Sequence, residues 1–150
     1  MTYLGFDLNS IHMTVKLTKQ RASTIRIKCA SLIHEKQITI LALAQVIGHL
    51  VCSFPGVEFG LLYYRNLESD KTMALANNQG NYAAKIVLSP NSISELRWWV
   101  NNIETAVKPI SHGEPHVFIK TDASMRGWGG SSRRDSDWRE VEHRRKTLSY

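Results

Sequence analysis

The sequence predicts an α+β protein with a β-hairpin near each end and helices between them. Apolar and polar residues alternate in two stretches near the N-terminus and again from residue 116 to 130, whereas the middle shows helical spacing. Residues 3–8 and 13–17 are the first two expected strands, and residues 9–12 supply their turn. Two antiparallel strands alone are marginal in water, so this hairpin is expected to need a neighbour to pack on.

A first helix is expected after Thr18, which is a good N-cap residue. Its apolar positions fall at helical spacing, at Ala22, Ile25, Cys29, Leu32 and Ile33. Lys19, Arg26 and Lys28 are expected on the opposite face. The pattern therefore predicts one buried face and one basic face.

A second helix is expected from Thr39, a cap residue, to the position before Pro55. The residues predicted to be buried are Leu43, Ile47, Leu50, Val51 and Phe54. Residues 37–57 contain no Asp, Glu, Lys or Arg over a length that can span a bilayer. Gln45 and His49 nevertheless form a polar stripe, so we expect a buried helix and no membrane partner.

A third, more polar helix is predicted at residues 60–76, with Leu61, Tyr64 and Leu67 inward and Arg65, Glu68 and Lys71 outward. Residues 77–87 are rich in Asn and Gly and are expected to form a loop, with a short strand at 84–88.

The last helix is predicted to start at Ser89–Pro90, because a proline at the first helical position leaves no amide proton unsatisfied. Its apolar positions are Ile93, Leu96, Val100, Ile103 and Val107, and Pro109 is expected to end it. Trp99 flanks the apolar stripe and is expected in the core, which leaves Trp98 as an interface residue.

Composition allows a real core and favours a polyanionic partner. Hydrophobic residues make up 43% of the chain, the formal net charge is +6, and the sequence pI is about 9.5. A basic balance is also common in proteins that bind no nucleic acid. Cys29 and Cys52 lie in apolar surroundings without CxxC spacing, so two buried free thiols are expected. They indicate a reducing, intracellular location, in the cytoplasm or the nucleus.

A domain boundary is predicted at residues 112–115, which separates residues 1–111 from residues 112–150. Residues 116–124 are expected to form a strand ending near Asp122, and residues 125–127 a turn before the partner strand at 128–130. The charge-dense stretch after Gly130 is predicted to be a solvated tail. An aspartate at a strand end is, by itself, most often a turn former or a cap.

Several strings resemble retroelement polymerases. TDAS, followed after two residues by GWG, is similar to the opening hairpin of the ribonuclease H domain of DIRS-type retrotransposons. Tyr3-Leu4-Gly5-Phe6 resembles the primer-grip hairpin that closes a reverse transcriptase palm. Residues 43–68 and 88–104 are similar to the thumb and connection of the same elements. The resemblance covers about residues 3–130, in the order of the family.

The resemblance implies two domain fragments. Residues 1–111 would be the C-terminal part of the reverse transcriptase, and residues 112–150 the truncated start of a ribonuclease H-like domain. Asp122 would be the first of four carboxylates, a catalytic residue and a ligand of Mg²⁺. Ribonuclease H chemistry needs two such ions, about 3.5 to 4 Å apart, held by several carboxylates. Residues 143–150 lack the Leu-Glu pair expected to bring the second one, and no palm aspartate pair is present. The fragment is therefore predicted to be inactive alone.

The implied nucleic-acid contacts are Tyr3, Leu4, Gly5 and Phe6 of the primer grip and Lys19, Arg26 and Lys28 of the first helix. Their partner would be an RNA–DNA hybrid or a DNA duplex, and the missing palm and ribonuclease H segments would be protein partners. Tyr3, Leu4 and Phe6 equally suit a sheet core, and the basic residues, with Arg21, an ordinary solvated face. The alternative is a non-catalytic helical nucleic-acid-binding or interaction protein derived from a retroelement.

Overall fold

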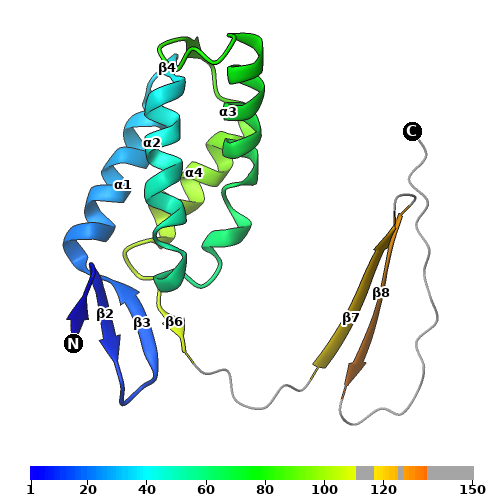
Figure 1. Ribbon diagram of the computed structural model, residues 1–150. Helices are drawn as coiled ribbons and strands as arrows, with labels where there is room; N and C mark the ends of the chain where they lie inside the picture. Colours follow the sequence, from blue (N-terminus) through cyan, green and yellow to red (C-terminus); the bar gives the residue numbers. More distant parts are fainter. Residues whose placement is uncertain (111–116, 125–126, 135–150) are drawn as a thin grey trace. The chain divides into compact units, whose positions relative to one another are not determined.

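The computed structural model describes residues 1–110, 117–124 and 127–134; from 117 onward it describes the backbone and the side chain of Ile119. The chain divides into two compact units, Met1–Ser111 and His112–Tyr150. The first holds a small sheet and four helices, and the second a pair of strands (Figure 1). The α+β class is thus confirmed. The predicted boundary loop, the turn at 125–126 and the tail from 135 lie outside the described residues.

The first sheet is antiparallel, in the order β1 (Thr2–Tyr3), β2 (Phe6–Asn9), β3 (Thr14–Leu17) and β6 (Lys108–Pro109). The prediction of one strand over residues 3–8 was wrong. The chain reverses between β1 and β2 through Leu4 and Gly5, whose φ angles are 48° and 81°. Two-residue hairpin loops favour positive φ at both positions because this matches the twist of the strands.

The predicted turn after β2 is confirmed. The side-chain oxygen of Asn9 accepts hydrogen bonds from the backbone N–H groups of Ile11 and His12, both at 3.0 Å. Asparagine stabilises a turn in this way because its short side chain stands in for a backbone acceptor.

The hairpin also finds the neighbour that it needs. Its strand β3 pairs with β6, and Leu17 at the end of β3 is buried in the core. Phe6 packs against the same core, and Gly56 lies so close that a Cβ there would be 3.0 Å from the Phe6 ring. The sheet is therefore attached to the helices of the first unit.

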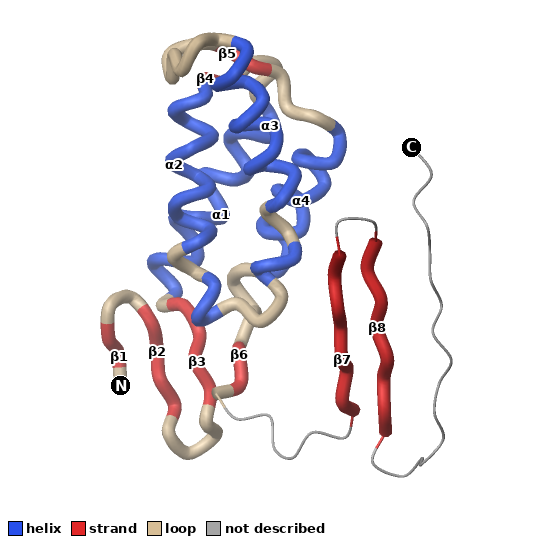
Figure 2. Tube along the Cα trace, turned by 45° about the vertical axis from the view of Figure 1, so that its right-hand side comes forward, coloured by secondary structure: helices blue, strands red, loops and turns tan. Residues whose placement is uncertain are grey.

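The four helices are α1 (Lys19–His34), α2 (Ile40–Val51), α3 (Arg65–Asn77) and α4 (Pro90–Asn102). They pack side by side, with the four-stranded sheet at one end and the short pair β4 (Ile38–Thr39) and β5 (Lys85–Ile86) at the other (Figure 2). The strand predicted within residues 84–88 is thus confirmed. No helix in the described ranges combines the length and hydropathy needed to cross a bilayer.

Local sequence signals placed two of the helix starts correctly. The hydroxyl of Thr39 accepts a hydrogen bond from the Ala42 N–H at 3.1 Å, and that of Ser89 from the Ser92 N–H at 3.2 Å. Thr18 occupies the N-cap position of α1, but its side chain makes no capping bond. The buried face of α1 is as predicted for Ala22, Ile25, Cys29 and Leu32.

The third helix starts five residues later than predicted, at Arg65. Residues Gly60–Leu62 form a separate 3-10 turn, η2, and Leu61 is 56% exposed rather than inward. A continuous helix would have the Leu67 N–H donate to the Tyr63 carbonyl. Instead that carbonyl accepts from the Trp99 ring nitrogen at 2.7 Å, and the Leu67 N–H donates to Glu95 at 3.1 Å. Tertiary hydrogen bonds therefore set the start of α3.

Two further predictions of helical residues were wrong. Val51 is the last residue of α2 and is 43% exposed, because the chain leaves the helix there for a 3-10 turn, η1 (Phe54–Gly56). The last helix ends at Asn102, so Val107 lies beyond it and is 42% exposed. Lys108–Pro109 instead extends along β3 as β6.

Helices α3 and α4 cap each other with carboxylates. Glu95 of α4 is buried and accepts from the backbone N–H groups of Asn66 and Leu67 and from the Asn66 side chain. Asp70 of α3 accepts from the Ser89 N–H at 2.9 Å and the Ser92 hydroxyl at 2.7 Å. A negative charge is favourable at a helix N-terminus, where the N–H groups and the helix dipole are positive. Each helix thus supplies the anion that the other needs.

Trp99 lies in the core, as predicted, with its side chain fully buried. Its ring stacks at 6.4 Å from that of Phe54 and lies against Gly60. Trp98 is half-buried and stacks on Tyr63, with ring centres 4.0 Å apart and planes 8° apart. The interface role predicted for Trp98 stays a prediction.

The second unit contains β7 (Val117–Ser124) and β8 (Gly127–Arg134), which pair antiparallel along their whole length. Asp122 lies opposite Gly129, and β7 continues for two residues beyond it, so Asp122 does not end the strand. Strand β8 likewise extends through residues 131–134, which were predicted to begin a solvated tail. They pair with residues 117–120 of β7, which is the physical reason for the difference.

Gly60 is expected to tolerate no side chain, because a Cβ there would lie 2.6 Å from the buried Trp99 ring. Gly60→Ala should lower the free energy of unfolding by about 1 to 3 kcal/mol, as overpacking does. Gly48→Ala is the matched control: a Cβ at this position in α2 meets nothing within 4 Å. It should raise stability by about 0.5 to 1 kcal/mol. Urea unfolding, monitored by circular dichroism, measures the free energy of unfolding of both variants. Changes of the same sign in the two variants would contradict the close packing of Gly60 against Trp99.

Candidate nucleic-acid interface

The turn between β1 and β2 projects two of the four predicted primer-grip side chains. Tyr3 is 58% exposed and Leu4 is 73% exposed, so neither belongs to a sheet core. Phe6 is half-buried and packs on the core, as the alternative interpretation expected. Gly5 is required by its positive φ and by the close approach of Arg21. The turn therefore exposes Tyr3 and Leu4 to solvent, while Phe6 anchors it to the core.

Arg21 of α1 holds this turn in place. Its guanidinium donates to the Leu4 carbonyl at 2.8 Å and to the Cys52 carbonyl at 3.1 Å. The same group lies 4.8 Å from the centre of the Phe6 ring, within the range of a cation–π interaction. A Cβ on Gly5 would be 2.9 Å from its Nη1 atom. One side chain thus connects the turn, the start of α1 and the residue after α2.

Arg21 was not among the predicted site residues. It was considered only as part of an ordinary solvated face. Its two acceptors are carbonyls 17 and 31 residues away, so no local pattern of residue types identifies them. The nearest signal is Gly5, because a glycine in a two-residue hairpin loop indicates a tight turn.

The basic residues of α1 lie on two borders of its buried face, so the prediction of a single basic face was wrong. At about 100° per residue, Lys19 and Arg26 share one border, and Arg21 and Lys28 share the other. Ile27, which is 63% exposed, lies near the middle of the outward face. Residues seven apart align on a helix, whereas residues two apart lie on different sides.

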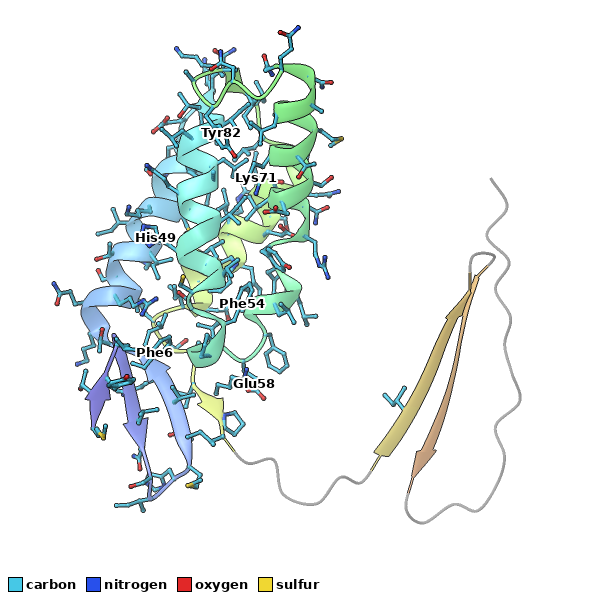
Figure 3. The ribbon with its side chains drawn as sticks, viewed as in Figure 1. Phe6, His49, Phe54, Glu58, Lys71 and Tyr82 are labelled. Atoms are coloured by element: carbon cyan, nitrogen blue, oxygen red, sulfur yellow. The ribbon has the colours of Figure 1, made fainter. Side chains whose placement is uncertain are left out.

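The two borders differ in their neighbours. On the first, Arg26 lies 3.7 Å from the Glu104 carboxylate just after α4, and both side chains are about half exposed. An exposed pair of this kind is weak but offsets the charge locally. On the second, Arg21 reaches the end of α2, and His49 lies on the side of α2 toward α1 (Figure 3). Burial lowers the pKa of His49, and the positive charges of Lys28 and Arg21 lower it further.

We call Tyr3, Leu4, Arg21, Lys28 and His49 together the Arg21 strip. It combines an exposed turn, a guanidinium, an ammonium and an imidazole on one side of the first unit. Such groups bind phosphate oxygens, because they offer charge-assisted hydrogen bonds without requiring a particular base. Lys28 shares the border of α1 that carries Arg21, about 10.5 Å farther along the helix, whereas Lys19 and Arg26 lie on the other border.

The two cysteines differ in exposure. Cys29 is fully buried, as predicted, and burial raises its pKa to about 12, which keeps it a thiol at neutral pH. Cys52 is exposed, so the prediction of two buried thiols was wrong for this residue. The reason is that Cys52 follows the last buried turn of α2.

Asp122 is the one acidic residue within the sequences of β7 and β8. Within the described residues, no group of three or more His, Cys, Asp or Glu is placed to hold a metal ion. A pair of Mg²⁺ ions needs oxygen ligands from several elements. Because the side chain of Asp122 lies outside the described part of the chain, the two-ion site implied for it stays a prediction. His112, His116 and the acidic residues after 134 lie outside the described part of the chain.

Arg21→Lys is expected to loosen the turn, because a single ammonium cannot donate to both carbonyls and stack on Phe6. We expect a loss of about 1 to 2 kcal/mol in the free energy of unfolding. Exchange of the Thr18 amide proton, which donates to the Gly5 carbonyl at 3.0 Å, should also accelerate. Arg26→Lys is the control and should cost less than about 0.5 kcal/mol. Equal losses in both variants would contradict the role given to Arg21.

No protein-family model matches the chain, and no curated protein matches it. A solved structure with a similar fold is the foamy viral protease-reverse transcriptase, determined in complex with double-stranded DNA. The two chains are 13% identical, and the match covers 99% of this chain with a TM-score of 0.49. The chain spans 24% of that protein's length. These values describe a weak likeness of fold.

Proposed function

We propose that this chain is a fragment of a retroelement RNA-directed DNA polymerase and ribonuclease H, and that it contacts the backbone of a nucleic-acid duplex through the Arg21 strip. The strings at residues 3–6 and 121–129 support the family, because they resemble the primer grip and the opening ribonuclease H hairpin of DIRS-type elements. The observation that carries the contact is the attachment of the exposed turn to Arg21, which shares its border of α1 with Lys28.

The contact is one of charge rather than of sequence. Lysine and arginine displace counterions from phosphates, so binding of this type is salt-dependent and independent of base sequence. The exposed Tyr3 offers a hydroxyl that can donate to a phosphate oxygen. The proposed partner is a DNA duplex or an RNA–DNA hybrid.

We further propose that the fragment has no catalytic activity of its own. In the complete parent protein, Mg²⁺ would be held by Asp122 and by carboxylates from other segments, and the palm would supply nucleotidyl transfer. Those segments are the proposed protein partners. We also propose a reducing location, in the cytoplasm or the nucleus.

A second candidate is a non-catalytic nucleic-acid-binding or interaction protein derived from a retroelement. The hydrogen bonding of the first unit favours this candidate. Among the described residues of that unit, no buried side-chain nitrogen or oxygen lacks a hydrogen-bond partner. A unit satisfied in this way can be stable without the palm. A cooperative unfolding transition together with duplex binding would favour this candidate.

The logarithm of the affinity for duplex is expected to fall linearly with the logarithm of the salt concentration. Lys28→Gln should reduce the slope by about 1, because one phosphate contact is lost. Lys36→Gln is the matched control: Lys36 is exposed beyond the end of α1 and should leave the slope unchanged. Fluorescence anisotropy with labelled DNA duplex and RNA–DNA hybrid gives the slopes. An affinity that does not change with salt concentration, or the absence of binding, would disprove the proposed contact with the phosphate backbone.

Neither the chain nor its Asp122→Asn variant is expected to cleave the RNA strand of an RNA–DNA hybrid in the presence of Mg²⁺. A lone carboxylate cannot position two ions and the attacking water. Gel analysis of an end-labelled hybrid measures the cleavage. Robust magnesium-dependent activity that is lost in Asp122→Asn would show that the chain holds a complete site.

A further inference from the structure

We propose that His49 of α2 contacts phosphate together with Arg21 and Lys28, so that the interface spans two helices and binds more tightly as the pH falls. This inference rests on the proposed function and assigns a pH-dependent role to one residue of the Arg21 strip. His49 was noted in the sequence only as part of a polar stripe on a buried helix. The structure instead places it beside the basic border of α1.

The first support is the position of His49 along the two helices. Arg21 donates to the carbonyl of Cys52, which follows His49 by three residues, or about 4.5 Å of helix. Lys28 follows Arg21 by seven residues, or about 10.5 Å along α1. Figure 1 shows that α1 leads away from the four-stranded sheet and that α2 returns toward it. By the helical rise, the backbone of His49 is therefore expected to lie between those of Arg21 and Lys28 along the helix axes. The three groups form a short row.

The second support is the availability of the ring. His49 is half-exposed, and within residues 1–110 its ring takes part in no hydrogen bond or ion pair, although its carbonyl accepts from Ser53. An imidazole in this state can donate to a phosphate oxygen. Lys28 likewise makes no ion pair within the same residues.

The third support is the sign of the surrounding charge. From α1, the groups acting on His49 are Arg21 and Lys28, both positive. From α3, Glu68 is paired with Lys71 at 2.6 Å, and Asp70 accepts from the start of α4. The remaining neighbours of α2, β4 and η2, carry no charged residue, and neither does the rest of α2. Within residues 1–110, no carboxylate pairs with the His49 ring. The anion that pairs with this ring would therefore be a phosphate of the ligand.

The direction of the pH effect follows from these charges. In the free protein, burial and the two cations keep the pKa of His49 below its ordinary value, so the ring is neutral near pH 7. A bound phosphate offsets the cations and favours the imidazolium, which raises the pKa in the complex. Binding then takes up a proton, and affinity rises as the pH falls until the free protein is protonated as well. A rise of about one pKa unit on binding corresponds to about tenfold in affinity.

The test uses the full chain and a short DNA duplex, at constant ionic strength, with the pH changed from about 7.5 to about 5.5. The wild type should bind about 3- to 10-fold more tightly at the lower pH. His49→Gln should lose this dependence and bind the duplex with nearly equal affinity at both pH values. His34→Gln is the matched control, because His34 is exposed at the other end of α1. It should keep the wild-type ratio.

An independent measurement uses NMR to follow the titration of the His49 ring. The pKa of this ring should rise when duplex is added. Thermal unfolding shows that His49→Gln is folded. If this variant keeps the wild-type pH ratio, or the ring pKa is unchanged by duplex, the role of His49 is wrong while the proposed duplex contact stands. If no variant binds duplex at either pH, the proposed function fails, and this inference with it.

Discussion

The arrangement of the candidate interface depends on one side chain, Arg21. Its guanidinium ties the Leu4 carbonyl of the N-terminal turn to the Cys52 carbonyl at the end of α2, and it does so from the first turn of α1. Both acceptors are backbone atoms, so the contact fixes main-chain positions rather than side-chain rotamers. Gly5 makes the approach possible, since a Cβ there would meet the guanidinium. The position of the turn that exposes Tyr3 and Leu4 follows from this connection.

The acidic residues explain why the strip stays positive. Glu95 and Asp70 stabilise the starts of α3 and α4, Glu68 pairs with Lys71, and Glu104 pairs with Arg26. Four of the carboxylates of the first unit therefore act on other parts of the fold. The contacts of Glu95 and Asp70 also hold α3 and α4 together, and Trp99 of α4 is buried in the core. Because these four carboxylates are engaged elsewhere in the fold, none of them pairs with Arg21 or Lys28.

The two chemistries suggested by the sequence differ in what they require. Contact with a phosphate backbone needs only a few cations and hydrogen-bond donors, and we propose that Arg21, Lys28 and His49 supply them within one unit. Hydrolysis with two metal ions needs several carboxylates from different elements, and β7 and β8 contain Asp122 alone. A fragment can therefore keep the first property without the second. This difference in requirements is the reason for proposing a binding role.

Where a structural feature depends on residues a few positions apart, the sequence alone determined it. The caps at Thr39 and Ser89, the turn at Asn9 and the buried face of α1 are of this kind. The two basic borders of α1 also follow from the helical period. The tertiary structure decided the start of α3 and the contacts of Arg21. These depend on partners up to 36 residues away, as in the hydrogen bond from Trp99 to the Tyr63 carbonyl. Distant partners leave no local pattern, because only the packed chain brings their atoms together.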